Sequence, residues 1–187
     1  MNRIKSSISI PNILTVARIL LTPVFVILLL RNMFGTALLV FAAAGISDGL
    51  DGLIARCMNQ RTTLGSYLDP AADKLLLTSA FIAMAVLGVI PDWLMVIVIT
   101  RDVVIVLGLA ILTLTEKKYE VKPTLVSKCT TAIQILTVFV SLYDPTHLKL
   151  VHLHPMLLWG TAVLTTLSGL HYIYIGMNIL QEAELDG

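Results

Sequence analysis

The chain has 187 residues, of which 57% are hydrophobic and 13% are charged, and its mean hydropathy is +0.88. This composition predicts a membrane protein. A net charge of +1 gives no large excess of positive charge for binding nucleic acid, which argues against that class of partner.

Six apolar stretches follow one another along the chain, and each is predicted to be a membrane-spanning helix. About 20 residues cross a ~30 Å hydrocarbon core as a helix, which satisfies its own backbone groups where no water is available. The predicted helices run from Pro11 to Leu30, Thr36 to Ala55, Ser66 to Val89, Trp93 to Leu114, Leu125 to Leu142 and Pro155 to Leu180.

The segment before the first helix carries Ile4, Ile8 and Ile10 and is predicted to lie at the membrane interface. No linker or low-complexity stretch divides the sequence. We therefore expect an all-α fold: one polytopic membrane domain over residues 1–187, with six transmembrane helices and a short N-terminal interfacial segment.

Basic residues are distributed unevenly over the connections between these helices. One side has Arg3, Lys5, Arg56, Arg61, Lys117, Lys118 and Lys122, whereas the other has Arg31 and Lys149. Because cytoplasmic loops carry the excess of Lys and Arg, the first side is predicted to be cytoplasmic. Both termini and the connection at 56–65 then lie inside the cell, and we expect the membrane to be a bacterial inner (cell) membrane.

The second and third predicted helices carry the stretch "SDGLDGLIARCMNQRTTLGSYLDPAADK", residues 47–74. Asp48 and Asp51 are three residues apart, and Asp69 and Asp73 are four apart, so each pair shares one face of its helix. The short connection makes the helices antiparallel neighbours and allows the pairs to confront each other. Four carboxylates this close require a cation, and hard oxygen ligands suit Mg²⁺, Mn²⁺ or Ca²⁺.

An alternative is that these aspartates form structural ion pairs, such as Asp73 with Lys74 or Asp51 with Arg56. Charged residues at membrane depth are costly and usually functional, and pairing cannot cancel the acidic excess of this cluster. Gly52, one turn after Asp48, lies on the same face, where its missing side chain lets a bulky ligand approach the backbone.

The fourth and fifth predicted helices contribute Arg101 and Lys128. If both face the cavity, they can bind an anionic phosphate group. Alternatively, Arg101 pairs with Asp102, and Lys128 simply lies at the cytoplasmic boundary. Arg18 in the first helix is a further cation of this kind, and Lys74 is interpreted as a residue that balances Asp73.

The cysteines and the histidines of the predicted outer loop, although their side chains can bind metals, are interpreted as structural residues. Cys57 and Cys129 lack paired metal-ligand spacing and are interpreted as packing residues. His147, His152 and His154 fall in the predicted outer loop, across the membrane from the aspartates, and are interpreted as polar residues at the interface.

Eight residues of this region match a known signature, D-x2-D-G-x2-A-R-x8-G-x3-D-x3-D, at every spacing. They are Asp48, Asp51, Gly52, Ala55, Arg56, Gly65, Asp69 and Asp73. By this match the chain resembles the CDP-alcohol phosphatidyltransferases. Its predicted six-helix layout and its opening helix, "PNILTVARILLTPVFVILLL", are also similar to those of this family. In that family a CDP-linked lipid, usually CDP-diacylglycerol, gives its phosphatidyl group to an alcohol and releases CMP.

The resemblance implies roles for individual residues. Two divalent cations, Mg²⁺ or Mn²⁺, would be held by the four aspartates, and Asp73 would also act as general base on the acceptor hydroxyl. The CDP group would contact Gly52, Arg56 and Gly65. Family members are homodimers, so we expect a homodimer here.

Three alternative functions are considered for the chain. The opening helix resembles phosphatidylglycerophosphate synthases, which favours glycerol 3-phosphate as acceptor and phosphatidylglycerophosphate as product. By contrast, "RDV" and "KPTLVSKCTTAIQ" are closer to CMP-forming cardiolipin synthases, whose acceptor is phosphatidylglycerol. A cation transporter or channel is the remote alternative, but its site is expected near the bilayer midplane rather than beside a cytoplasmic loop.

Overall fold

The structure is a computed structural model that describes the backbone of residues 10–58, 63–114, 124–146 and 149–185. Side chains are described for residues 15–47, 74–108, 124–146, 149–178 and 181. Within these residues all regular secondary structure is α-helical, which confirms the all-α part of the predicted fold class. The helices are α1 (Ile10–Leu30), α2 (Phe34–Met58), α3 (Thr63–Val86), α4 (Asp92–Leu114), α5 (Leu125–Tyr143) and α6 (Leu153–Leu185).

Two of the turns depend on left-handed backbone conformations. Asn32, between α1 and α2, has φ 58°, which asparagine tolerates better than most residues. Gly88 has φ 69°, and the N–H of Val89 donates to the carbonyl of Met84 at 2.9 Å, as in a Schellman motif. This turn ends α3 at Val86, so the sequence-based end at Val89 was three residues too late.

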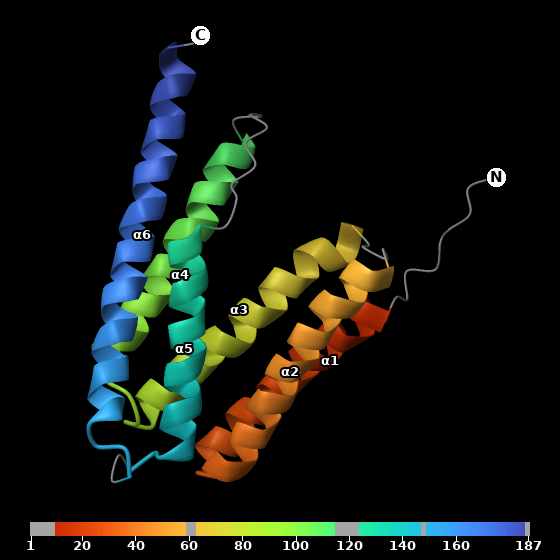
Figure 1. The fold of residues 1–187 in the computed structure, drawn as a ribbon, viewed down its shortest axis with the longest axis vertical. Coiled ribbons are helices and arrows are strands. Elements are labelled where there is room, and N and C mark those ends of the chain that lie inside the picture. Colours follow the sequence, from red (N-terminus) through yellow and green to blue (C-terminus); the bar gives the residue numbers. More distant parts are fainter. Residues whose placement is uncertain (1–9, 59–62, 115–123, 147–148, 186–187) are drawn as a thin grey trace, which may run out of the picture.

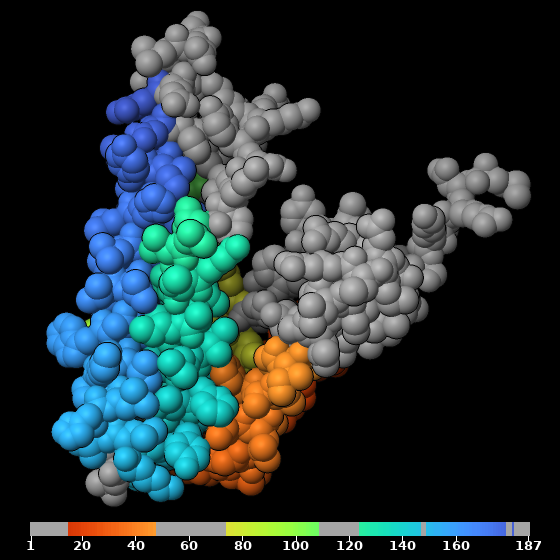
Figure 2. All heavy atoms as spheres, viewed as in Figure 1, coloured from red at the N-terminus to blue at the C-terminus, as the bar shows by residue number. Residues whose placement is uncertain are grey.

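The helices run alternately up and down, and Figure 1 shows them as two groups that diverge toward one end. One group contains α1, α2 and α3, and the other contains α4, α5 and α6. We call the end where the groups diverge the open end. Toward it lie the start of α1, the connected ends of α2 and α3, and the last residues of α4 and α6. The groups meet where α5 packs against α2 and α3, and Figure 2 shows α5 directly beside α2. This arrangement agrees with the predicted alternation of loops between two sides.

Apolar side chains fill the closed end of the molecule and also cover much of its exterior. The buried core includes Phe25, Phe41, Phe81 and Met84, and the rings of Phe25 and Phe41 are 5.7 Å apart. Many large apolar side chains on the outer helix faces are exposed, including Met156, which is 75% exposed. An apolar surface of this extent indicates a membrane protein rather than a water-soluble one.

Two helices are long and apolar enough, within the described side chains, to cross a membrane. They are Leu125–Tyr143 in α5 and Leu153–Asn178 in α6. Shorter apolar segments occur at Thr15–Leu30, Phe34–Ser47 and Lys74–Val86. The structure therefore supports a helical membrane protein, while six complete spans remain a prediction. The predicted interfacial segment falls on residues 1–9, outside the described residues, and Ile10 is the first residue of α1.

Polar side chains join α5 to α6 along their length. The Thr130 hydroxyl donates to the Leu164 carbonyl at 3.1 Å, and Gln134 donates to the Thr165 hydroxyl at 3.1 Å. Farther along, the hydroxyls of Thr137 and Thr161 are 2.7 Å apart, and Ser141 lies 3.1 Å from Nε2 of His154. Such hydrogen bonds between small polar residues hold helices together in membranes. We call this row the α5–α6 polar seam.

This packing bears on two interpretations made from sequence. His154 is buried at the beginning of α6 and bonded to Ser141, so it packs between α5 and α6, and its position at the membrane interface stays a prediction. His152 is exposed, and His147 lies outside the described residues. Cys129 is an exposed free cysteine, so it is not a packing residue, whereas the side chain of Cys57 is outside the described set.

Asp144 organises the connection from α5 to α6. Its Oδ2 accepts hydrogen bonds from the backbone N–H groups of Lys149 at 2.7 Å and Leu150 at 2.8 Å, and Oδ1 accepts one from Thr146. We expect Asp144→Ala to lower the free energy of unfolding by about 1–3 kcal/mol, because it leaves these donors unsatisfied. Denaturant unfolding in detergent would measure this, with Thr146→Ala as the control that removes only one bond. An equal loss in both variants would contradict the backbone role of Asp144.

Candidate functional site

The four predicted metal ligands lie on α2 and α3, in the halves of these helices that meet at their connection (Figure 1). Asp48 and Asp73 stand at the same distance from the helix ends Met58 and Thr63, and Asp51 and Asp69 match to within one residue. Because the chain reverses direction between α2 and α3, the two pairs occupy corresponding levels. The side chains themselves fall outside the described residues, so the carboxylate cluster remains a prediction.

The same limit applies to the predicted CDP-binding positions. Gly52 and Arg56 lie in the last turns of α2, and Gly65 lies in the first turn of α3. The backbone of all three residues is therefore helical. What their side chains or backbones contact is not described, and their roles remain predictions.

A pocket of about 200 Å³ lies beside the aspartate-bearing parts of α2 and α3, and residues of five helices line it. Gly45, on its wall, lies one turn before Asp48 in α2, and Lys74 directly follows Asp73 in α3. The pocket therefore adjoins the parts of α2 and α3 that carry the aspartates. Its lining residues are Arg18 of α1; Phe41, Ala44 and Gly45 of α2; Lys74, Leu76 and Leu77 of α3; Arg101 and Asp102 of α4; and Thr131, Gln134 and Ile135 of α5.

Positive charge dominates the polar part of this lining. Arg18, Lys74 and Arg101 come from three different helices, and Asp102 supplies the one carboxylate among the described lining residues. Arg18 is 2% exposed and Arg101 is 6% exposed, so their charges lie deep in the protein. Cations buried within membrane helices are costly and usually mark a functional site. This lining suits a singly or doubly charged anion.

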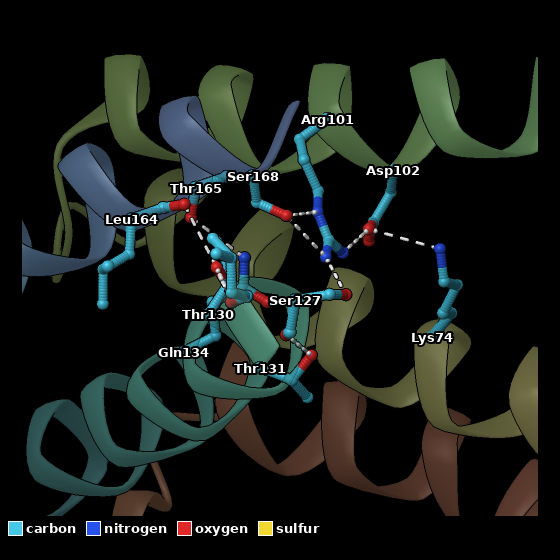
Figure 3. A network of polar contacts seen from close by, with 11 residues as sticks. Lys74, Arg101, Asp102, Ser127, Thr130, Thr131, Gln134, Leu164, Thr165 and Ser168 are labelled. Carbon is cyan, nitrogen blue, oxygen red and sulfur yellow. Dashed lines mark hydrogen bonds and ion pairs between the residues drawn. The ribbon is translucent and has the colours of Figure 1, made fainter. Parts of the chain in front are cut away.

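Arg101 forms the centre of a hydrogen-bond network (Figure 3). Nη1 donates to Oδ1 of Asp102 at 2.8 Å, which confirms the alternative that these neighbours pair. Nη2 donates to the hydroxyls of Ser127 at 2.7 Å and Ser168 at 3.1 Å, and Nε donates to Ser168 at 3.3 Å. The guanidinium is thereby held by α4, α5 and α6 at once.

Asp102 also receives a hydrogen bond from Lys74. The Lys74 Nζ lies 3.3 Å from the same Oδ1 that accepts from Arg101 (Figure 3). One carboxylate thus links a lysine of α3 to an arginine of α4. Lys74 was interpreted from sequence as a residue that balances Asp73, whose side chain lies outside the described set, and its pairing with Asp102 was not suggested by the sequence.

The two cations predicted to bind an acceptor phosphate are placed differently. Arg101 lines the pocket, whereas Lys128 is exposed and is not among the lining residues. Arg18 and Lys74 accompany Arg101 instead. Sequence reasoning did not identify Ser127, Gln134 or Ser168 as parts of the site. Their small polar side chains within apolar helices are a detectable signal, but their partners depend on how the helices pack.

Comparison with known proteins relates most of the chain to one family. The family model described as CDP-alcohol phosphatidyltransferase matches residues 8–167. A cardiolipin synthase (CMP-forming) of Rattus norvegicus is 38% identical, and one of Homo sapiens is 37% identical, over 190 aligned residues that cover 92% of this chain. A probable phosphatidylglycerophosphate synthase of Mycobacterium tuberculosis is 32% identical over 88% of this chain and 80% of its own length. The chain spans 63% of the length of the rat and human relatives.

Proposed function

Because the chain belongs to the CDP-alcohol phosphatidyltransferase family, we propose that it transfers a phosphatidyl group from CDP-diacylglycerol to phosphatidylglycerol. The products are cardiolipin and CMP. The observation that carries this proposal is the match of the whole family signature, from Asp48 to Asp73, together with relatives named cardiolipin synthase (CMP-forming). The cationic pocket beside the signature provides a place for the acceptor.

The choice of acceptor differs from the one favoured by the sequence alone. The sequence favours glycerol 3-phosphate, because the first helix resembles phosphatidylglycerophosphate synthases and Arg101 with Lys128 offers positive charge suited to a small phosphate monoester. The relatives named cardiolipin synthase are more similar to this chain than the one named phosphatidylglycerophosphate synthase, and this supports phosphatidylglycerol. The described lining, with three positive charges and one negative charge, can bind the phosphate group of either acceptor, so the choice rests on these relatives.

The four aspartates fit a pair of hard divalent cations, because carboxylate oxygens are the donors that Mg²⁺ and Mn²⁺ prefer. In this proposal Asp48, Asp51, Asp69 and Asp73 hold the cations from two antiparallel helices. When bound, the cations supply positive charge that stabilises the pyrophosphate of the donor and the leaving CMP. Gly52, Arg56 and Gly65 bind the CDP group on the same helices.

The transfer step is a substitution at phosphorus. The terminal (primary) hydroxyl oxygen of the phosphatidylglycerol headgroup forms a bond to the phosphorus that carries diacylglycerol, and the bond from that phosphorus to the CMP oxygen breaks. The hydroxyl proton passes to the carboxylate of Asp73, which acts as general base. Arg101, Lys74 and Arg18 orient the acceptor through its phosphate group. Lys128 lies outside the pocket lining, so we assign it no contact with the acceptor.

The membrane setting suits two lipid substrates. We propose that all six helices span a bacterial inner membrane, with the aspartates and both termini on the cytoplasmic side, as the distribution of basic residues predicts. The acyl chains of donor and acceptor then remain in lipid while their headgroups meet in the pocket. By resemblance to the family, the chain acts as a homodimer.

An acceptor assay tests this function directly. Purified protein in detergent with labelled CDP-diacylglycerol is expected to form cardiolipin and release CMP when phosphatidylglycerol is present. Glycerol 3-phosphate in its place is expected to give no phosphatidylglycerophosphate above background. Thin-layer chromatography with mass spectrometry identifies both lipids, and the nucleotide is quantified separately.

The outcomes of this assay separate the three candidate functions. Formation of phosphatidylglycerophosphate with no cardiolipin would restore glycerol 3-phosphate as the acceptor and leave the transfer chemistry intact. If neither acceptor releases CMP, while the protein carries cations across vesicle membranes, the transporter alternative replaces the enzyme. A heat-denatured sample controls for chemical hydrolysis of the donor.

A further inference from the structure

Arg101, in the lining of the pocket, contacts two helices that carry none of the aspartates, α5 and α6. Its alkyl chain lies against α6 at Gly169, where a methyl group would be 3.7 Å from Cγ and 3.8 Å from Cβ of the arginine. Its guanidinium then reaches two hydroxyls, Ser127 of α5 and Ser168 of α6. We call Ser127 and Ser168 the serine pair.

The serine pair accounts for most of the donors of Arg101. A guanidinium has five N–H groups in a fixed planar arrangement. Nε and one N–H of Nη2 donate to Ser168, and the other N–H of Nη2 donates to Ser127. One N–H of Nη1 donates to Asp102, so the hydrogen bonds to described residues do not use the second N–H of Nη1. Because the guanidinium is planar, fixing Nε and Nη2 also fixes the direction of Nη1.

The fixed Nη1 edge lies on the side of the network that contains Asp102 and Lys74 (Figure 3). Both of these residues line the pocket with Arg101. An anion bound there can therefore meet a preoriented N–H group and the nearby Lys74 ammonium. Preorientation reduces the loss of side-chain freedom on binding, which otherwise weakens affinity.

The serine pair is itself held by the α5–α6 polar seam. Ser168 is fully buried, and one turn before it on α6 lies Thr165, a member of the seam, which accepts from Gln134 at 3.1 Å. Ser127 lies in the first turn of α5, where its backbone N–H donates to the capping hydroxyl of Thr124. Both hydroxyls thus stand on helices whose relative position is fixed by several other hydrogen bonds.

We infer that Ser127 and Ser168 are positioning residues for the acceptor: they orient Arg101 so that Nη1 faces the phosphate group of the bound lipid. This inference rests on the proposed function, in which Arg101 contacts that phosphate. It assigns a role in substrate recognition to α6, which contributes no residue to the family signature and none to the described lining of the pocket. The serines act through Arg101 and touch neither substrate.

Kinetics of the variants test the inference. Ser168→Ala is expected to raise KM for phosphatidylglycerol on the order of tenfold, with little change in KM for CDP-diacylglycerol, because a hydrogen bond to a charged group is lost. Ser127→Ala is expected to act in the same direction, and Ser127→Thr, which keeps the hydroxyl at a half-buried position, is expected to restore the wild-type KM.

A matched control separates positioning from packing. Thr161→Ala removes a hydroxyl that is as buried as that of Ser168, on the same helix, but its partner is Thr137 rather than Arg101. This variant is expected to lose stability without a selective change in KM for phosphatidylglycerol. If Thr161→Ala and Ser168→Ala raise that KM equally, the serines act only through packing and the inference is overturned.

A double-mutant cycle with Arg101 decides the remaining case. In an Arg101→Lys background, which lacks the planar fork, Ser168→Ala is expected to cause no further rise in KM for the acceptor. If Arg101→Lys and Arg101→Ala both leave that KM unchanged, the proposed contact of Arg101 with the acceptor is wrong, and the inference falls with it. If these variants raise KM but neither serine variant does, only the positioning role is wrong.

Discussion

Removal of divalent cations is expected to abolish turnover, with a loss of roughly 100-fold or more, and addition of Mg²⁺ or Mn²⁺ should restore it. The physical reason is the concentration of four carboxylates on α2 and α3, at corresponding levels of two antiparallel helices. In the proposed site these like charges lie close together, so they would repel one another and also repel the pyrophosphate of the donor. Bound cations remove both penalties. CMP release in EDTA, followed by titration with each metal, measures the effect.

Two controls make this test specific to the protein. EDTA that has been saturated with Mg²⁺ before addition should have no effect, which excludes an action of the chelator on detergent or lipid. Asp51→Asn should raise the Mg²⁺ concentration needed for half-maximal activity, because a neutral amide is a weaker ligand than a carboxylate. Full turnover in excess free EDTA would show that the aspartates serve another purpose, such as structural ion pairing.

The helices of this fold could be predicted because apolar length is a strong signal. All six predicted ranges correspond to helices of the structure, and α4 and α5 begin and end within one residue of the prediction. The largest differences arise at helix ends. At the end of α3, a left-handed Gly88 stops the helix early, and an apolar run that continues through Val89 conceals this turn.

The chemistry of the site could be predicted only in part, because residue type and spacing do not specify which helices touch. The signature aspartates and Arg101 were recognised from their cost in an apolar chain. Ser168, by contrast, is far from Arg101 in sequence and becomes its partner only when α6 packs on α4. Lys128 was expected beside Arg101, but it is an exposed residue of α5, whereas Lys74 reaches the pocket.

Replacement of Asp73 by asparagine is expected to lower kcat by roughly 10²–10⁴-fold while much of the affinity for CDP-diacylglycerol is kept. Asparagine has nearly the same shape but cannot accept a proton from the acceptor hydroxyl at neutral pH. The three other aspartates still supply carboxylates for at least one cation, so the donor can bind. Single-turnover rates and equilibrium binding of CDP-diacylglycerol, measured on the same sample, separate the two effects.

Asp92→Asn provides the matched control for this substitution. Asp92 begins α4 beside the turn that follows α3, at the end of the helices opposite the connection between α2 and α3 (Figure 1). The same loss of charge there should leave kcat unchanged. A near-normal kcat in Asp73→Asn would show that another group takes the proton. If binding and kcat instead fall together, Asp73 acts chiefly as a metal ligand, because loss of the cation weakens donor affinity as well as the transfer step.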